Sequence, residues 1–401
     1  MRNIHIRPEK ALQELLSYSQ KLGHGMQNLL EVGDIRTGVT PKEAVYREDK
    51  LTLYRFQASA DKPPQDRVPL LIVYALVNRP YMTDLEEGRS MVRGLLDAGL
   101  DVYLVDWGYP DRADRYLGLD DYINGYMDRC VDIVRRRSGL DAINVLGICQ
   151  GGAFSLCYAA LHPAKVRNLV TMVTPVDFHT PKDMLSHWVR HVDVDAAVEA
   201  SGNIPGELLN STFLMLKPYR LMGQKYLDMI DQLGDPNRIQ NFLRMEKWIF
   251  DSPDQAGEAF RQFIKDFYQQ NKLLKGTLRI GEGTVNLKNV TMPVLNIYAT
   301  EDHLVPPDAS MALKHHVGTG DYTELAFPGG HIGIYVSGRA QKLVPPAIGG
   351  WIKERAGHKA AAVETRATKP KGRRNAPAVA GRTTGSGDGK GAKHAKKDAD
   401  G

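Results

Sequence analysis

The sequence predicts a doubly wound α/β fold, in which a mostly parallel β-sheet carries helices on both faces. Several short, nearly continuous apolar segments support this prediction, because such segments are typical of strands buried on both faces of a parallel sheet. They are LTLYRFQA at 51–58, PLLIVYALV at 69–77, DVYLVDW at 101–107, INVLGI at 143–148, NLVTMVT at 168–174 and PVLNIYA at 293–299. Helical patterns at 91–98, 119–137 and 153–162 separate them. This alternation of strands and helices indicates an α/β architecture.

The composition fits a globular protein whose charge is unevenly distributed. The chain has 401 residues, 42% of them hydrophobic, which is enough for a large core. Its net charge of +5 comes from residues 356–401, which hold eleven Lys and Arg against four Asp and Glu, whereas the rest of the chain holds 41 against 43. The body therefore lacks the basic signature of nucleic-acid binding. Only the basic tail is a candidate for contact with DNA or an anionic surface.

The cysteines and the start of the chain bear on the cellular compartment. Cys130, Cys149 and Cys157 form no CxxC pair, and their odd number does not suggest a disulfide framework. The first residues, MRNIHIRPEK, lack the apolar segment of a signal peptide, and no apolar run is long enough to span a membrane. We expect a cytoplasmic protein, in which a free thiol can act as a nucleophile. No cluster has metal-ligand spacing, so we expect neither a metal nor another cofactor.

The chain divides into four predicted parts. Residues 1–45 form an N-terminal helical segment, because Leu and Met recur every three or four positions there; it either packs on the body or binds a partner or a granule. Residues 46–176 and 284–355 form the α/β core. Residues 177–283 are rich in Met and aromatic residues with helical periodicity, and we expect a cap insertion. Residues 356–401 contain too few large apolar residues to fold and form a disordered basic tail.

The segment GICQGG at 147–152 carries the main chemical signal. It follows a predicted strand, precedes a predicted helix and has the pattern G-x-C-x-G, which is the nucleophile elbow of the α/β-hydrolase fold with cysteine in place of serine. The sharp turn lifts the nucleophile off the strand, and the helix N-terminus favours a thiolate. We expect Cys149 to be the nucleophile rather than a buried cysteine in a tight turn. Cys157 and Cys130 are expected in the core.

An acid and a histidine complete the predicted catalytic triad. In this fold the order along the chain is nucleophile, acid, histidine. Asp302 follows the strand PVLNIYA, with Glu301 as the less favoured neighbour, and His331 follows the strand YTELAF in a glycine-rich loop. His303 is a rival base, but only His331 comes after the last strand, so His303 is expected at most in the pocket wall.

Two backbone N–H groups are needed to stabilise an oxyanion during acyl transfer. One is expected from Gln150, directly after the nucleophile, and the other from Val77 or Asn78 in the loop that ends an early strand. The same loop places Arg79 and Tyr81 near the pocket. Arg79 is an equally good candidate for a structural ion pair.

Five segments together resemble the catalytic subunit of class III polyhydroxyalkanoate synthases. The likeness runs over roughly residues 5–355, and the basic tail has no recognised counterpart. The segments are GICQGG, VYALVNRPYMTDL, DVYLVDWGYPD, DHLVPPDAS and AFPGGHIGIYVSG. This combination is far more specific than the elbow alone.

The resemblance implies an activity that spacing cannot show. Such enzymes polymerise (R)-3-hydroxyacyl-CoA, usually 3-hydroxybutyryl-CoA, through a cysteine thioester and release CoA. They act with a second, non-catalytic subunit, in homo- or hetero-oligomers, on cytoplasmic polyester granules. The family roles fall on Cys149 as nucleophile, His331 as base and Asp302 as third member. Asp302 either orients His331 or activates the hydroxyl group of the incoming monomer.

Two alternatives have the same elbow in common with a synthase. One is a cysteine hydrolase of the same fold, such as a dienelactone hydrolase or an intracellular polyester depolymerase. The long aromatic insertion and the DHLVPPDAS segment argue against it. The other is a granule-associated scaffold without catalysis, which has no need of an intact triad.

Overall fold

The computed structural model describes residues 13, 35–58 and 68–356. They belong to the first of two structural units, Met1–His358; the second, Lys359–Gly401, lies outside the described residues. The predicted basic tail, apart from Ala356, and most of the predicted N-terminal helical segment therefore also lie outside them. Within that segment, residues 35–41 are not helical and residues 42–45 belong to strand β1, so the sheet begins before the expected boundary.

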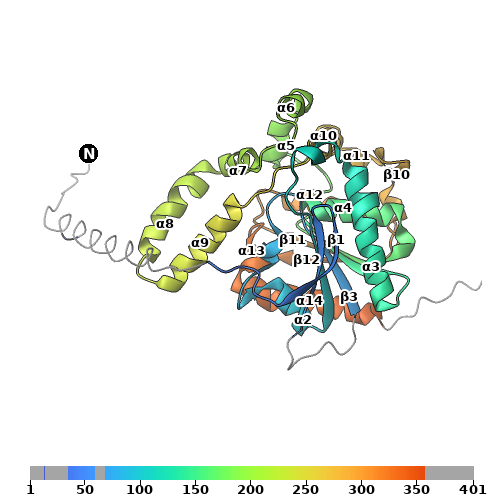
Figure 1. Ribbon diagram of the computed structural model, residues 1–401, viewed down its shortest axis with the longest axis horizontal. Helices are drawn as coiled ribbons and strands as arrows, with labels where there is room; N and C mark the ends of the chain where they lie inside the picture. The colour runs from blue at the N-terminus through green and yellow to red at the C-terminus, as the bar shows by residue number, and fades with distance from the viewer. Residues whose placement is uncertain (1–12, 14–34, 59–67, 357–401) are drawn as a thin grey trace, which may run out of the picture. The chain divides into compact units, whose positions relative to one another are not determined.

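An eight-stranded sheet forms the centre of the unit (Figure 1), with the strand order β1-β2-β6-β3-β7-β8-β11-β12. The β1–β2 and β2–β6 pairs are antiparallel, and all pairs from β6 to β12 are parallel. The bounds are β1 Lys42–Glu48, β2 Leu51–Phe56, β3 Val68–Val73, β6 Leu100–Asp106, β7 Ile143–Ile148, β8 Val166–Met172, β11 Val294–Ala299 and β12 Tyr322–Phe327. The predicted mostly parallel sheet is confirmed.

Helices cover both faces of the sheet, as the alternation along the sequence predicts. Side chains of one strand alternate between two apolar clusters, because successive residues of a strand point to opposite faces: in β3, Leu71 belongs to one cluster, which includes residues of α3 and α4, and Ile72 to the other, which includes residues of α2 and α14. Figure 1 shows these helix pairs on either side of the strands. The bounds are α2 Met91–Asp97, α3 Asp128–Ser138, α4 Gln150–Leu161 and α14 Gly338–Ala356.

A helical region separates β8 from β11, where the strand pattern in the sequence stops. Between them the chain also forms the two-stranded sheet β10–β9. The elements are α5 Met184–Val189, α6 Val194–Ser201, α7 Gly206–Met215, η5 Tyr219–Gln224, α8 Lys225–Gln232, α9 Pro236–Phe250, α10 Gly257–Gln262, η6 Phe263–Gln269, α11 Lys272–Lys275, β9 Leu278–Ile280 and β10 Gly283–Val285. The aromatic residues of the segment are used for packing: the Phe178, Phe263 and Phe267 rings contact one another.

Short elements complete the connections. They are η1 Pro80–Thr83, β4 Asp84–Glu86, β5 Arg89–Ser90, η2 Arg112–Tyr116, η3 Asp121–Met127, η4 Pro163–Lys165, η7 Leu287–Asn289, α12 Pro307–Met311, η8 Ala312–His315 and α13 Gly333–Val336. β4 pairs with β5 in a separate two-stranded sheet. Every loop that carries a predicted site residue follows the carboxyl end of a parallel strand, where α/β folds place their ligand sites.

The turn from β7 into α4 is packed too tightly for side chains at its glycines. A Cβ atom on Gly147 would lie 2.5 Å from the Cα atom of Gly152, and one on Gly152 would overlap the side chain of Thr174. A Cβ atom on Gly151 would run into the carbonyl oxygen atoms of Val73 and Tyr74 in β3 and the following loop. These contacts explain why glycine stands at all three positions.

We expect Gly152→Ala to lower the free energy of unfolding by about 1–3 kcal/mol, because the new methyl group overpacks the turn against Thr174. The double variant Gly152→Ala/Thr174→Ala should recover part of this loss. Urea unfolding of the purified variants measures both effects.

Gly350→Ala is the matched control, because Gly350 lies in α14 and a Cβ atom there meets nothing within 4 Å. Alanine is the better helix former, so this variant should be at least as stable as the parent. Equal losses in Gly152→Ala and Gly350→Ala would contradict the packing argument.

Candidate active site

Cys149 lies between the last residue of β7 and the first residue of α4, in a conformation that non-glycine residues rarely adopt. Its backbone angles are φ 55° and ψ −122°. The Cys149 N–H donates to the carbonyl oxygen of Met172 over 2.9 Å, and its own carbonyl accepts from the N–H of Gly152 over 2.9 Å. The half-buried side chain lines a cavity. The geometry of a nucleophile elbow is present at the predicted cysteine.

His331 and Asp302 meet at the same edge of the sheet. His331 Nδ1 lies 2.7 Å from Asp302 Oδ2, and the His331 ring lies near enough to Cys149 for this side chain to raise the pKa of the ring. The other carboxylate oxygen, Asp302 Oδ1, accepts from the backbone N–H groups of Leu304 (2.8 Å) and Val305 (2.9 Å). The Asp302 side chain is 0% exposed and the His331 side chain 6%. The three residues predicted as a triad thus lie together, with His331 hydrogen-bonded to Asp302 and next to Cys149.

The charge on His331 follows from this arrangement. Burial by itself lowers the pKa of His331, but the Asp302 carboxylate and the Cys149 side chain oppose it and raise the pKa to about 10. At neutral pH the ring is therefore favoured in its protonated form, beside the Cys149 sulfur. A positive charge in this position stabilises a thiolate and can later be neutralised by giving a proton to a leaving group.

A cavity of about 470 Å³ opens at Cys149 and runs into the helical region. This volume is in the range of about 300–1,000 Å³ that holds a small organic ligand. Its wall is mostly apolar and combines core residues with residues of α7, α9 and η6, including Phe213, Trp248, Phe263 and Ile264. Such a wall suits an acyl chain better than a charged substrate.

The predicted oxyanion donors lie in the loop after β3 and at the start of α4. Val77, Asn78 and Gln150 all line the cavity, and Gln150 begins α4, where the first N–H groups have no acceptor within the helix. The Gln150 side chain also accepts a hydrogen bond from the Leu76 N–H over 3.0 Å. This bond, which sequence reasoning did not foresee, holds the loop against the elbow.

Arg79 and Tyr81 do not line the cavity, contrary to the expectation from their place in the loop. Arg79 Nη2 forms an ion pair with Asp106 Oδ2 at 2.7 Å, so the structural alternative applies to it. Tyr81 donates to Asp251 Oδ2 over 3.0 Å. Tyr109 donates to the other oxygen of the same carboxylate over 2.6 Å. Both tyrosines are therefore bound to the residue that follows α9.

Further contacts attach the loop to α9. The Trp248 Nε1–H donates to the carbonyl oxygen of Arg79 over 2.8 Å. The Asn78 side-chain amide lies 3.3 Å from the carbonyl oxygen of Ile249 and 3.3 Å from Ser252 Oγ. The backbone of Asn78 has φ 61°, which asparagine tolerates better than most residues. The helical region thus fixes the loop that carries the predicted oxyanion donors.

Other cavity residues differ in how far the sequence reveals them. His303 lines the cavity, and burial together with the nearby Lys217 lowers its pKa to about 4, so it is neutral. Tyr74 and Tyr335 also line the cavity, and burial raises the pKa of both hydroxyl groups. Sequence reasoning missed both tyrosines. The only signal was position, because Tyr74 directly follows β3 and Tyr335 lies four residues after His331.

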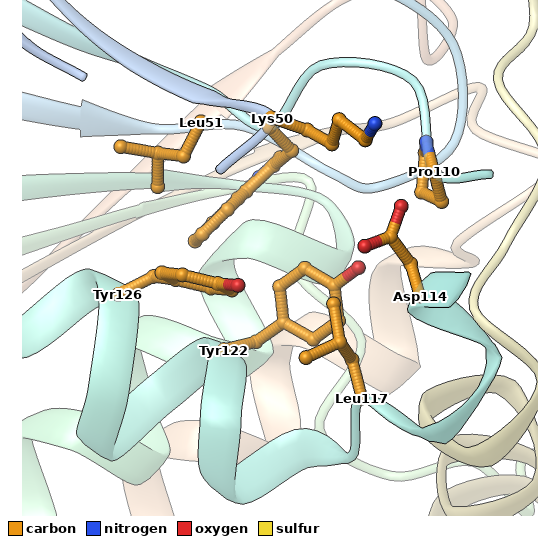
Figure 2. A pocket seen from close by; sticks show the side chains of 8 residues that line it. Lys50, Leu51, Pro110, Asp114, Leu117, Tyr122 and Tyr126 are labelled. Atoms are coloured by element: carbon orange, nitrogen blue, oxygen red, sulfur yellow. The ribbon is translucent and has the colours of Figure 1, made fainter. Parts of the chain in front are cut away.

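A second hollow has a volume of about 10 Å³ and shares no lining residue with the large cavity. Figure 2 shows its wall, in which Tyr122 and Tyr126 of η3 lie near Lys50 and Asp114. A space of this size holds about one water molecule. This hollow is therefore too small for an organic substrate.

The described part of the chain offers neither a metal site nor a helix able to span a membrane. Among residues 13, 35–58 and 68–356, no group of three or more His, Cys, Asp or Glu side chains is arranged to hold a metal ion. Within the same residues, no helix combines the length and apolar character needed to cross a membrane.

Comparison with known proteins agrees with this geometry. The family model for the α/β-hydrolase fold matches residues 68–337, so the chain belongs to the α/β-hydrolase fold family, as the sequence predicts. Among solved structures, the monoacylglycerol lipase of Paleococcus ferrophilus has a TM-score of 0.49 and 16% identity, covering 77% of this chain and all of that one.

Curated proteins of similar sequence identify a family within this fold. The chain is 68% identical to the poly(3-hydroxyalkanoate) polymerase subunit PhaC of Allochromatium vinosum, over 88% of this chain and 99% of that protein. It is 66% identical to the subunit of the same name from Thiocystis violacea, over 88% and 100%, and 57% identical to that from Synechocystis, over 86% and 94%. The chain belongs to the family of poly(3-hydroxyalkanoate) polymerase subunits, which confirms the resemblance stated from the sequence.

We expect iodoacetamide to modify Cys149 of the folded protein much faster than Cys130 or Cys157. Both other cysteines are fully buried, and burial raises the pKa of Cys130 to about 12 and that of Cys157 further still. Every 1.4 kcal/mol of opening free energy slows a buried thiol about tenfold. Mass spectrometry of timed digests measures the three rates, and equal rates in the folded protein would refute this assignment.

The raised pKa of His331 predicts a pH dependence of stability. The usual value of 6.5 applies to the unfolded chain, and the folded value is about 10. The stabilisation is therefore complete below about pH 6.5 and is lost as the pH rises toward 10. Asp302→Asn removes the carboxylate, so the stability advantage of the parent over this variant should be largest near pH 6 and shrink toward pH 10.

Urea unfolding of both proteins across this pH range measures the difference. Asp308→Asn, at an exposed position in α12, is the control and should show no such trend. A difference between the parent and Asp302→Asn that stays constant with pH would contradict the assigned ion pair.

Proposed function

We propose that this chain is the catalytic subunit of a poly(3-hydroxyalkanoate) polymerase. It links (R)-3-hydroxyacyl units, above all 3-hydroxybutyryl units, from their CoA thioesters into a polyester and releases CoA. The observation that carries the proposal is that Cys149, His331 and Asp302 lie together at a large apolar cavity. The protein is also closely similar, over 88% of its length, to a polymerase subunit.

The first half-reaction transfers the acyl group to the enzyme. The Cys149 thiolate attacks the thioester carbonyl carbon, the bond from that carbon to the CoA sulfur breaks, and protonated His331 gives its proton to the leaving CoA thiolate. The backbone N–H groups of Gln150 and of Val77 or Asn78 stabilise the oxyanion that forms meanwhile. Exchange of one thioester for another is nearly balanced in energy, so the acyl-enzyme remains reactive.

The second half-reaction lengthens the chain. His331, now neutral, takes the proton of the hydroxyl group of the incoming monomer. The hydroxyl oxygen attacks the acyl carbon on Cys149, so that an ester bond forms and the bond from this carbon to the Cys149 sulfur breaks. The apolar cavity wall excludes water, which would otherwise release free acid. In this proposal the helical region at 177–283 acts as the cap over the core at 46–176 and 284–355.

We assign Asp302 the role of orienting His331. Its side chain is 0% exposed, it is absent from the cavity wall, and its oxygens already accept hydrogen bonds from His331, Leu304 and Val305. A monomer hydroxyl in the cavity therefore meets His331 and not the Asp302 carboxylate.

Partners and location follow from the family. The relatives are named as subunits, which supports a second, non-catalytic subunit in a homo- or hetero-oligomer. Because the polyester product is insoluble in water, an enzyme that extends it is expected at the surface of polyester granules in the cytoplasm. Acyl-CoA is a substrate here, and the proposed chemistry needs no cofactor.

The decisive experiment mixes the full chain and the second subunit with 3-hydroxybutyryl-CoA. Release of CoA together with polymer supports the polymerase. Free 3-hydroxybutyrate instead of polymer would point to a cysteine hydrolase or depolymerase, and the absence of thiol release would point to a scaffold.

We expect Cys149→Ala to abolish CoA release, with a loss of at least ~10³-fold, because the acyl-accepting sulfur is gone. Cys130→Ala and Cys157→Ala should keep much of the activity, since both residues are fully buried in the core. A thiol-trapping dye follows CoA release, and circular dichroism verifies that each variant is folded. An active Cys149→Ala variant would disprove the central assignment.

A further inference from the structure

The side chain of Gln255, in the segment between α9 and α10, has a buried amide donor with which no described residue forms a hydrogen bond. Gln255 is 3% exposed and lines the same cavity as Cys149. Its Nε2 atom is buried and has no hydrogen-bond partner among the described residues. Leaving a buried amide donor unpaired costs free energy, so this group calls for a partner that enters the cavity.

The backbone of Gln255 does not need its side chain. The Gln255 N–H donates to the carbonyl oxygen of Ile204, and the Ile204 N–H donates to the carbonyl oxygen of Gln255, each over 2.9 Å. This reciprocal pair fixes the position of residue 255 for any side chain. The side-chain amide therefore extends into the cavity wall from a backbone that is fixed without its help.

Three other side chains that the helical region contributes to the cavity wall already donate hydrogen bonds within the protein. Trp248 donates to the carbonyl oxygen of Arg79, Asn210 to that of Ile249 and Thr212 to that of Leu208. Gln255 is thus the amide in this part of the wall whose donor remains available for a ligand.

We propose that the Gln255 amide donates a hydrogen bond to an ester carbonyl oxygen of the polyester chain attached to Cys149. The inference rests on the proposed function and adds a binding site for the product chain to it. A polyester offers a carbonyl acceptor in every unit but a hydroxyl donor only at its end, so an unpaired donor in an apolar wall matches its repeating chemistry. The thioester carbonyl itself is bound at the oxyanion donors, so Gln255 serves a more distant unit.

The test compares two acyl-CoA substrates with the full-length protein in the presence of its second subunit. One carries a single 3-hydroxybutyrate unit and the other carries three linked units whose terminal hydroxyl is replaced by hydrogen, which stops further growth. Gln255→Met keeps the length of the side chain and removes the donor. Single-turnover CoA release at low substrate concentration should fall by about 2- to 10-fold for the three-unit substrate and stay within about twofold for the single unit.

Thr180→Val is the matched control. The Thr180 side-chain oxygen is also buried without a hydrogen-bond partner among the described residues, but Thr180 does not line the cavity. Its replacement should leave both rates unchanged. Thermal unfolding verifies that both variants are folded.

A change in the substrate provides a second arm that does not depend on a variant. Replacing the two distal ester carbonyls of the three-unit substrate by methylene groups should slow the parent protein by the same factor and leave Gln255→Met unaffected. If Gln255→Met slows both substrates alike, or neither, the inference is overturned. If the parent releases CoA from neither substrate, the proposed function fails, and the inference fails with it.

Discussion

The site depends on the backbone of Cys149 being held at a positive φ between a strand and a helix. Such a conformation costs roughly 1–3 kcal/mol for a residue with a side chain, and it persists only where the surroundings fix it. Here the bond from Cys149 to Met172 in β8 fixes one side and the bond from Gly152 fixes the other. The carbonyl oxygens of Val73 and Tyr74 approach Gly151 so closely that the turn cannot relax. The strain thus keeps the sulfur in the cavity, where His331 reaches it.

The constellation could be predicted from the sequence because its members occupy positions that the topology defines. Cys149 follows β7, Asp302 follows β11 and His331 follows β12, and parallel strands bring these loops to one edge. The rest of the site depends on contacts between segments distant in the sequence. From the sequence, Arg79 is an equally good candidate for a pocket residue and for an ion-pair partner. Only the structure shows that Asp106 lies beside it. The amide of Gln255 carries no signal at all until its surroundings are known to be apolar.

The fold shows the same division. Apolar runs in the sequence predict the buried strands. The helix α14 is harder to predict, because it contains Pro345 and Pro346, which normally end a helix. Pro345 packs against α2 because α2 presents a glycine to it: a Cβ atom on Gly94 would lie 2.7 Å from the Cβ atom of Pro345. Likewise, Gly349 faces Ala98 without room for a side chain. Such a small-residue contact between two helices is a property of the pair, and neither segment reveals it alone.

The attachment of α9 to the loop after β3 has a thermodynamic consequence. Asp251 binds Tyr81 and Tyr109, and Trp248 binds the backbone of Arg79. Withdrawing α9 to widen the cavity breaks these bonds together and leaves the loop held by the Leu76–Gln150 hydrogen bond and the Arg79–Asp106 ion pair. The position of α9 and the order of the loop are therefore coupled, and a bound acyl chain that favours the closed helix also favours the contacts between that helix and the loop.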